Sequence, residues 1–508
     1  MTFPLLKNLA FLEAMIAVGY AIFFTCLKRS LRREIGFKPV IIFAGLAAAC
    51  FLAPNLWVLH LIFFCWVPLL ARTREQVGML LMLALLATPP LTLDLNIGSI
   101  PIFGLTAQGS LALGAFVAMG ALPGKNARLP ALADLPALLI LILLVVVGAR
   151  DTSLTNWLRQ TAFIAVSWAL PYYVITRTLP SPESIHRACI RLAAAAAMLA
   201  AIVLYERHSF WPLYAVLNDK YGIIRGPLEL VVKIREGLLR AEGPMGEATA
   251  MGFILVIGLA AVLVSRRAFR SHTAYMAILA LVGLGLLAPQ SRGGWLGAAV
   301  AVLAFGAYQL RGRSAAVFPL VAVGAGAVAY GALNYGARGQ TVDGSVEYRT
   351  RLWQRGLEEF QERPWLGDSY QDLVKQMSDL IQGEGIVDFV NSYLYFALLV
   401  GSLGLVMFIL FLGVPSVRVW LARRKLAQGI IELDVCAFCF GVLSSAAVMF
   451  ALTSFLPRAA LIVMIVAGFV GRLAHGAQRS PRISIVRPAG QQASFRTPLC
   501  EFSDEAKL

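Results

Sequence analysis

The sequence predicts an all-α, polytopic integral membrane protein, on the evidence of its composition, its apolar runs and the distribution of its charges. Hydrophobic residues make up 59% of the 508 residues and charged residues only 14%. This is more apolar surface than a single soluble core can bury. The excess must face lipid, which excludes a soluble enzyme or a soluble binding domain.

Apolar runs of helix-spanning length recur along the chain. A spanning helix needs about 20 largely apolar residues because the hydrocarbon layer is ~30 Å thick. Examples of such runs are 8–27, 135–148, 248–265, 275–288, 294–310, 315–333, 389–413 and 455–471. Two shorter runs, 40–53 and 56–70, need flanking snorkelled residues to span. We expect about 13–15 transmembrane helices.

The basic residues orient these helices, because short loops rich in Lys and Arg stay in the cytoplasm. With the N-terminus outside, 27 of the 44 basic residues lie on the inner side. Of the other 17, 12 fall in two long loops, 205–247 and 334–388. The sequence therefore predicts a multi-pass protein of a bacterial inner membrane with both loops in the periplasm. The net charge of +16 is a topology signal and does not argue for nucleic acid.

The predicted organisation alternates membrane segments with these loops. It comprises N-terminal transmembrane helices (1–204), a first periplasmic loop (205–247), central transmembrane helices (248–333), a second periplasmic loop with an amphipathic helix (334–388), C-terminal transmembrane helices (389–473) and a cytoplasmic tail predicted to be disordered (474–508).

The second loop contains an amphipathic helical pattern that ends at Arg363-Pro364. Leu352, Gly356 and Phe360 lie along one stripe, whereas Arg351 and Arg355 share the opposite face. That charged face is either a solvated surface with ion pairs between successive turns or a binding surface.

A shorter segment, Ser291-Arg292-Gly293-Gly294-Trp295-Leu296-Gly297, lies between two apolar runs at the predicted outer surface. An arginine at this depth is costly unless it is paired, and glycines allow a backbone or a ligand to approach closely. Arg292 either anchors the helix by snorkelling or binds an anionic group such as a phosphate through two parallel hydrogen bonds.

The segment 291–297 resembles the signature of the bacterial O-antigen ligase and polysaccharide polymerase superfamily. Three further pieces are similar to family motifs and follow in the family's order: Arg240-Ala-Glu-Gly243-Pro244 to an Arg-x-x-Gly segment, the helix from Arg351 to Arg363-Pro364-Trp365-Leu366-Gly367 to a loop helix closing in Pro-x-x-Gly, and Asn391 with Gly401-Ser-Leu-Gly404 to His-Asn-x9-Gly-x-x-Gly. The chain has Val390 where the ligases carry His. This departure favours the polymerase branch.

The resemblance implies a C-type glycosyltransferase-like fold and an inverting, metal-independent transfer without a cofactor. A glycan would pass from an undecaprenyl-diphosphate carrier to an acceptor hydroxyl. Arginines would stabilise the leaving diphosphate, and a carboxylate would accept the proton. The candidate diphosphate-binding residues are Arg240, Arg292, Arg351 and Arg355, and the candidate catalytic residues are Asp388, Glu242, Glu247 and Asn391, the last to orient a sugar hydroxyl.

The expected partners are the undecaprenyl-diphosphate-linked oligosaccharide, an acceptor glycan, membrane lipid and other polysaccharide assembly proteins. Two alternatives to a polymerase stay open. The first is a ligase that attaches the glycan to lipid A core or another acceptor. The second is a non-enzymatic flippase or transporter, which predicts ionisable residues lining a path through the membrane. Glu13 and Asp134 are the only acidic residues assigned to the predicted spans or their edges, which weighs against transport.

Overall fold

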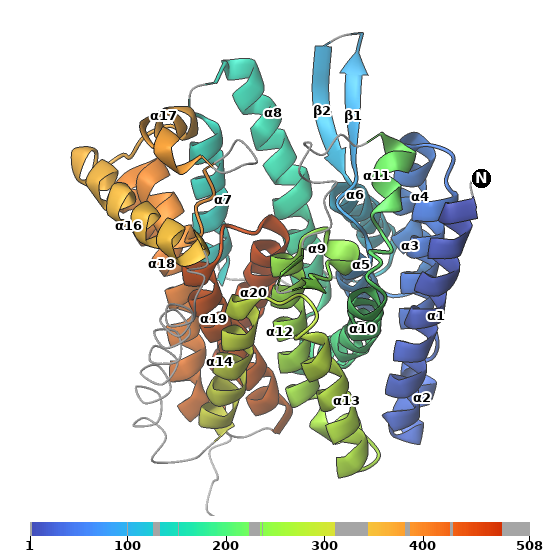
Figure 1. Cartoon of the computed structure of the whole chain (residues 1–508). Coiled ribbons are helices and arrows are strands. Elements are labelled where there is room, and N and C mark those ends of the chain that lie inside the picture. The colour runs from blue at the N-terminus through green and yellow to red at the C-terminus, as the bar shows by residue number, and fades with distance from the viewer. Residues whose placement is uncertain are drawn as a thin grey trace, which may run out of the picture.

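The computed structural model describes residues 3–98, 100–124, 133–150, 152–222, 234–235, 237–309, 344–381, 387–426 and 430–479. These residues form a bundle of helices with one elaborated end, which we call the loop-bearing end. It carries the β1–β2 hairpin and helices α8, α11, α16 and α17, at the top of Figure 1. The predicted all-α class is confirmed.

The N-terminal part of the bundle consists of α1 (Phe3–Cys26), α2 (Arg29–Ile35), α3 (Lys38–Leu52), α4 (Leu56–Leu70), α5 (Arg74–Ala87), β1 (Thr92–Ile97), β2 (Ile100–Thr106), α6 (Ala107–Ala121), α7 (Leu135–Gly148), α8 (Leu154–Ile164), a π-helical turn (Ala165–Ala169), α9 (Leu170–Thr178) and α10 (Pro182–Ser209). The remainder consists of α11 (Val216–Tyr221), β3 (Ile234–Arg235), β4 (Leu238–Leu239), α12 (Ala248–Val264), α13 (His272–Gly285), α14 (Arg292–Gln309), α16 (Gly344–Glu362), α17 (Tyr370–Gln376), α18 (Ser392–Leu426), α19 (Ile430–Leu452) and α20 (Pro457–Arg479).

Four helices in the described part of the chain are long and apolar enough to cross a membrane alone, namely α1, α10, α18 and α19. The bent pair α2–α3 makes a fifth if it counts as one span, and α4, α6, α7, α12 and α13 are shorter apolar helices. The chain is therefore a polytopic membrane protein. The predicted span 315–333 lies outside the described residues, so the expected count of 13–15 spans stays a prediction.

Helix α10 runs through the middle of the bundle (Figure 1) and is buried along most of its length. Its alanine run, Ala193–Ala197, provides a flat surface on which glycines of neighbouring helices pack. A Cβ atom added to Gly19 of α1 would lie 2.7 Å from the carbonyl oxygen of Ala197. A Cβ atom added to Gly285 of α13 would lie 2.6 Å from the Cβ of Ala200. Small residues therefore allow α10 to contact its neighbours at backbone distance.

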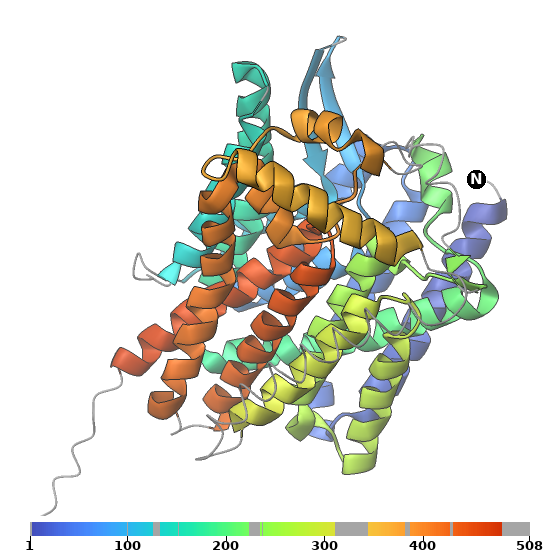
Figure 2. The same ribbon diagram turned by 60° about the vertical axis from the view of Figure 1, so that its left-hand side comes forward.

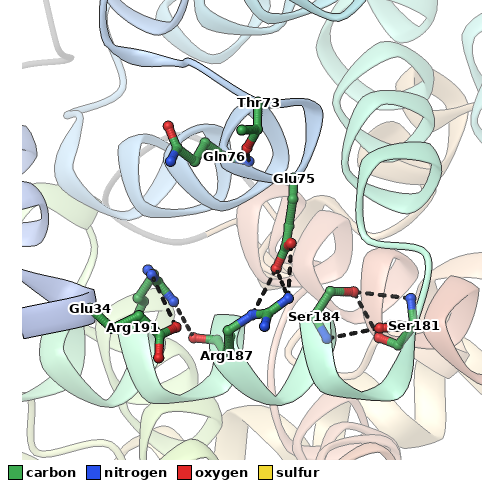
Figure 3. Close-up of polar contacts among 8 residues, drawn as sticks. All are labelled: Glu34, Thr73, Glu75, Gln76, Ser181, Ser184, Arg187 and Arg191. Atoms are coloured by element: carbon green, nitrogen blue, oxygen red, sulfur yellow. Dashed lines mark hydrogen bonds and ion pairs between the residues drawn. The ribbon is translucent and has the colours of Figure 1, made fainter. Parts of the chain in front are cut away.

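Polar contacts fix the first turns of α10 (Figure 3). Ser181 and Ser184 form a reciprocal capping box that satisfies backbone N–H groups at the start of the helix. One turn further on, the guanidinium of Arg187 donates two hydrogen bonds of 2.9 Å to the carboxylate of Glu75 on α5. Figure 3 shows Glu75 reaching from α5 to this arginine. These contacts set the position of α10 relative to α5.

The sequence analysis did not predict the two β-hairpins. The β1–β2 hairpin pairs Thr92 with Thr106 in antiparallel register, and β3 pairs with β4 beside the site described below. The signal for β1 was an alternation of polar and apolar residues from Thr92 to Ile97, followed by Gly98 at φ 61°. It was missed because short alternating segments are weak signals between long apolar runs.

The assignment of Glu13 and Asp134 as the only acidic residues in or near spans was wrong. Asp434 lies inside α19 and is only 2% exposed. Its carboxylate lies 3.2 Å from a guanidinium nitrogen of Arg267 and accepts a 2.9 Å hydrogen bond from the side chain of Gln309. This pairing gives Asp434 a structural role, so it adds no support to the transporter alternative.

Gly285 and Gly283 on the same helix allow a matched test of the packing on α10. Gly285→Ala forces a Cβ against Ala200 and should destabilise the fold by about 1–3 kcal/mol. Gly283→Ala meets nothing within 4 Å and should be neutral or stabilising by about 0.5–1 kcal/mol, because alanine is the better helix former. The apparent melting temperatures of the two purified variants measure the difference. Equal melting temperatures would show that α13 does not depend on this contact.

Candidate active site

The Arg-x-x-Gly segment, 240–244, is held at the loop-bearing end by a buried carboxylate. Glu206 lies in the last turn of α10 and is 1% exposed. It accepts hydrogen bonds from the backbone N–H groups of Gly243, at 2.9 Å, and Leu213, at 3.0 Å. From the other side, Arg458 at the start of α20 donates to the carbonyl oxygen of Pro244 at 3.2 Å. The segment is therefore fixed between α10 and α20.

The same segment docks on the residues that precede Arg292. The Nε of Arg240 donates to the carbonyl oxygen of Pro289 at 3.4 Å. Arg235, on β3, donates to the carbonyl oxygen of Gln290 at 3.1 Å. Gln290 has a φ of 50°, which is uncommon for a residue with a side chain. Two motifs that are about 50 residues apart in sequence thus meet at one place.

The glycines that follow Arg292 bring helices together. α14 begins at Arg292, and the Oγ of Ser291 accepts a 3.2 Å hydrogen bond from the backbone N–H of Gly294. A Cβ at Gly294 would lie 3.5 Å from the Cα of Gly252 on α12, and one at Gly297 would collide with Met449 on α19. The close approach expected at these glycines is therefore to neighbouring helices, and it fixes the start of α14.

Helix α16 turns an apolar stripe toward the bundle. Leu352 is 2% exposed, and a Cβ added to Gly356 would lie 3.0 Å from the side chain of Leu394 on α18. Arg349 precedes these residues by three and by seven positions, so it lies on the same stripe. Its side chain is half-buried, whereas that of Arg351 is exposed.

The charges around Arg349 define the centre of the site. Burial lowers the pKa of Arg349, and the positive charges of Arg235 and Arg292 lower it further, while the carboxylate of Asp388 opposes this shift. Arg349 therefore lies in one electrostatic neighbourhood with two other arginines and one aspartate, all from different segments of the chain.

Arg235 also connects this group to Arg240. Burial lowers the pKa of Arg240, and Arg235 lowers it further, whereas Glu242 and Glu247 act in the opposite direction. The predicted residues Arg240, Glu242 and Glu247 thus influence one another electrostatically. Arg235, which the sequence analysis did not select, acts on both Arg240 and Arg349.

The structure does not bring Arg351 and Arg355 into this cluster. Arg351 pairs with Glu347, one turn earlier on the exposed face of α16. Arg355 lies 2.9 Å from a carboxylate oxygen of Glu358 and 3.8 Å from one of Asp379. Their predicted role in binding a diphosphate stays a prediction.

Asp388 and Asn391 lie between the second loop and α18. The backbone N–H of Asp388 donates to the hydroxyl of Tyr348 at 2.9 Å, and that hydroxyl donates to the Asp388 carbonyl at 3.0 Å. The Oγ of Ser454 donates to the Asp388 carboxylate. The Oδ1 of Asn391 accepts hydrogen bonds from the backbone of Tyr393, at 2.9 Å, and from that of the next residue, which caps the start of α18.

Sequence reasoning missed Arg235 and Arg349, and only one of them had a usable signal. Arg349 is an arginine on the apolar stripe of an amphipathic helix, which is uncommon unless the residue faces a buried polar site. Arg235 has no comparable signal, because its position depends on a two-residue strand pairing.

The arrangement gathers four guanidinium groups and three carboxylates at the loop-bearing end. Guanidinium groups match phosphate oxygens with paired hydrogen bonds, and partial burial strengthens such contacts. A carboxylate beside them can accept a proton from a hydroxyl group. Within the described part of the chain, no three His, Cys, Asp or Glu side chains are grouped so as to hold a metal ion.

Comparison with known protein families matches one segment of the chain. Residues 276–412 match the family model described as O-antigen ligase, and a search of curated proteins finds no match. The matched segment runs from α13 into α18 and contains Arg292, Arg349, Asp388 and Asn391. The chain is therefore a multi-pass membrane protein that carries an O-antigen ligase-like segment.

Proposed function

We propose that this protein transfers a glycan from an undecaprenyl-diphosphate carrier to a sugar hydroxyl at the periplasmic face of a bacterial inner membrane. In this proposal it polymerises O-antigen or exopolysaccharide repeat units by an inverting, metal-independent step. The observation that supports it is the convergence of Arg235, Arg240, Arg292 and Arg349 from separate segments beside Asp388.

The arginines suit a diphosphate leaving group. Negative charge develops on the bridging oxygen as the glycosidic bond breaks, and fixed positive groups stabilise that charge most where water is partly excluded. The charge of Arg235 acts on both Arg240 and Arg349, and that of Arg292 acts on Arg349. This spread of positive charge would let the site hold both phosphates at once.

The acceptor hydroxyl needs a base, and we assign this role to Asp388. Of the three candidate carboxylates, Asp388 is the one that influences Arg349, which is itself influenced by Arg292. Glu242 and Glu247 instead influence Arg240. In an inverting step the acceptor hydroxyl attacks the sugar carbon from the face opposite the diphosphate, so Asp388 would act across that carbon from the phosphates that the arginines bind. Asn391 would orient a sugar hydroxyl through its Nδ2 group, because its Oδ1 caps α18.

Val390 favours a polymerase over a ligase. In the ligase motif a His precedes the Asn, and an imidazole can exchange protons and hydrogen-bond with an acceptor. The valine here can do neither. The family description favours the ligase as the second candidate. In that case another residue of this chain would act on the acceptor.

Arg349 and Arg351, two residues apart on α16, allow a matched test of the arginine cluster. Arg349→Ala should lower glycan transfer by about 10²–10³-fold, because one stabilising group of the leaving diphosphate is lost. Arg292→Ala should have a similar effect. Arg351→Ala should stay within a few-fold of the unsubstituted protein, because Arg351 pairs with Glu347 on the exposed face. The measurement is transfer by purified protein in nanodiscs; an equal loss in the two α16 variants would contradict the assignment.

The base assignment predicts a loss of turnover without a loss of donor binding. Asp388→Asn keeps the size of the side chain but removes the proton acceptor, so transfer should fall by about 10²–10⁴-fold. Binding of the lipid-linked donor should change little. Glu242→Gln serves as the comparison and should retain more activity. If Glu242→Gln is the more impaired variant, the base lies on the Arg240 side.

The choice between polymerase and ligase is tested in cells. Deleting the gene for a polymerase should leave carrier lipid that bears single repeat units, because chain growth stops. Deleting the gene for a ligase should leave long polymer on undecaprenyl diphosphate. Extraction of the carrier lipids and sizing of their glycans distinguishes the two. Polymer of normal length on the carrier would establish the ligase alternative.

A further inference from the structure

The Pro-x-x-Gly segment, 364–367, and the Gly-x-x-Gly segment, 401–404, pack against each other at the loop-bearing end of α18. Gly367 and Gly401 both have positive φ, at 63° and 69°. A Cβ added to Gly367 would lie 2.7 Å from the backbone nitrogen of Gly401, and one added to Gly401 would lie 2.5 Å from that of Leu366. The backbone N–H and the hydroxyl of Ser402 both donate to the carbonyl oxygen of Pro364, at 2.7 and 2.6 Å. We call residues 364–367 the corner.

The corner also contacts the end of α7, and an ion pair joins the residues on its two sides. The guanidinium of Arg150, just past the end of α7, donates to the carbonyl oxygen of Leu366. An ion pair of 2.7 Å joins Arg363 to Asp368, and the backbone N–H of Asp368 donates to the carbonyl oxygen of Leu398 at 2.7 Å. The backbone of the corner is therefore fixed on both α7 and α18.

The side chains of this fixed corner nevertheless point away from the protein. Trp365 is 76% exposed and Leu366 is 65% exposed. Large apolar groups in a mobile loop can fold back onto a core, but these two are held outward by their backbone. A rigid, exposed pair of this kind marks a surface that contacts another apolar phase or molecule.

The outer surface of the neighbouring helices α7 and α18 indicates that this apolar phase is lipid. α7 and α18 pack against each other, and both carry exposed large hydrophobic residues on their outer sides. Examples are Ile142 on α7 and Leu403 and Val406 on α18. Because the chain spans a membrane, this wall faces lipid. Leu403 follows directly after the contact between Gly401 and the corner, so the corner continues the wall toward the loop-bearing end.

The length of α18 places the corner at the edge of the hydrocarbon layer. The segment of α18 after Gly401 runs to Leu426, which at 1.5 Å per residue is ~37 Å long. That is enough to cross a hydrocarbon layer of ~30 Å without the turns before Gly401. The kink at Gly401 and the corner packed on it therefore fall near one membrane boundary. Tryptophan is enriched at this depth, because its ring is apolar and its N–H is polar.

We propose that the corner, through Trp365 and Leu366, inserts into the lipid interface and anchors the second loop there. The occupant of this surface is the bilayer itself, at the boundary between headgroups and acyl chains. The corner directly follows α16, so the anchor fixes the depth of that helix and with it the depth of Arg349. A diphosphate attached to a membrane-embedded carrier lies at the same depth. The anchor itself does not depend on the proposed glycan transfer.

Spin labels on the full-length protein in phosphatidylcholine and phosphatidylglycerol nanodiscs test this proposal. Trp365→Cys and Leu366→Cys carry the label at the corner. Val406→Cys is the lipid-facing control, and Glu358→Cys, on the exposed charged face of α16, is the water-facing control. The unsubstituted chain gives the background labelling of native cysteines. Collision rates with oxygen, which partitions into lipid, and with a water-soluble nickel complex report the surroundings of each label.

At positions 365 and 366, oxygen collisions should exceed nickel collisions, as at position 406, whereas position 358 should show the reverse. A corner that matches position 358 lies in water, and the proposal fails. A corner shielded from both reagents is covered by protein, such as a second copy of this chain, and the proposal also fails. Two adjacent label positions keep the test valid if one variant does not fold. Because the readout is not activity, loss of glycan transfer in these variants bears only on the proposed function.

Discussion

The close approach of other helices to α10 is the constraint on which the arrangement of the bundle depends. Within a membrane, lipid tails are as apolar as side chains, so helices associate through packing at short distance. The alanines of α10 face Gly19, Gly258 and Gly285 on three different helices, and a Cβ at any of these glycines would lie within 3 Å of α10. The contacts of Arg187 and Ser181 fix the first turns of the same helix (Figure 3). A helix held along its length carries Glu206 to a defined position at its other end.

The position of Glu206 determines where the charged residues of the site lie. Glu206 satisfies the backbone at Gly243, and the adjoining residues place Arg240 and Arg235 against the segment before Arg292. In the view of Figure 2, α16 lies across this end of the bundle, and it brings Arg349 to the same group. Like charges held together oppose folding, because they repel one another. The packing of α10, α14 and α16 must overcome this repulsion, and an anionic ligand would relieve it.

The sequence predicted the class of fold and part of the site, for physical reasons that differ from residue to residue. Apolar runs reflect the thickness of the bilayer, and the asymmetry of basic residues reflects which side of it a loop occupies. Both therefore predict a polytopic membrane protein without knowledge of helix packing. Arg240 and Arg292 were found because each lies in a short family-like motif. Arg351 and Arg355 were selected from the charged face of α16, whereas the structure places Arg349, on the apolar stripe, in the cluster. Arg235 depends on a hairpin that local sequence does not predict.

In the motif around Asn391, some residues have a structural role and one position would have a role only in the reaction. Asn391 caps α18, and Gly401 accepts the backbone of the corner at a positive φ, so both residues have structural work in this chain. A histidine at position 390 would have no structural role of this kind, because the cap of α18 and the contact between Gly401 and the corner both form with Val390 present. A chain that shares the fold but transfers to a different acceptor is expected to keep the structural residues and lose the chemical one. Val390 beside Asn391 and Gly401 fits this expectation, and it is the reason that we propose a polymerase in preference to a ligase.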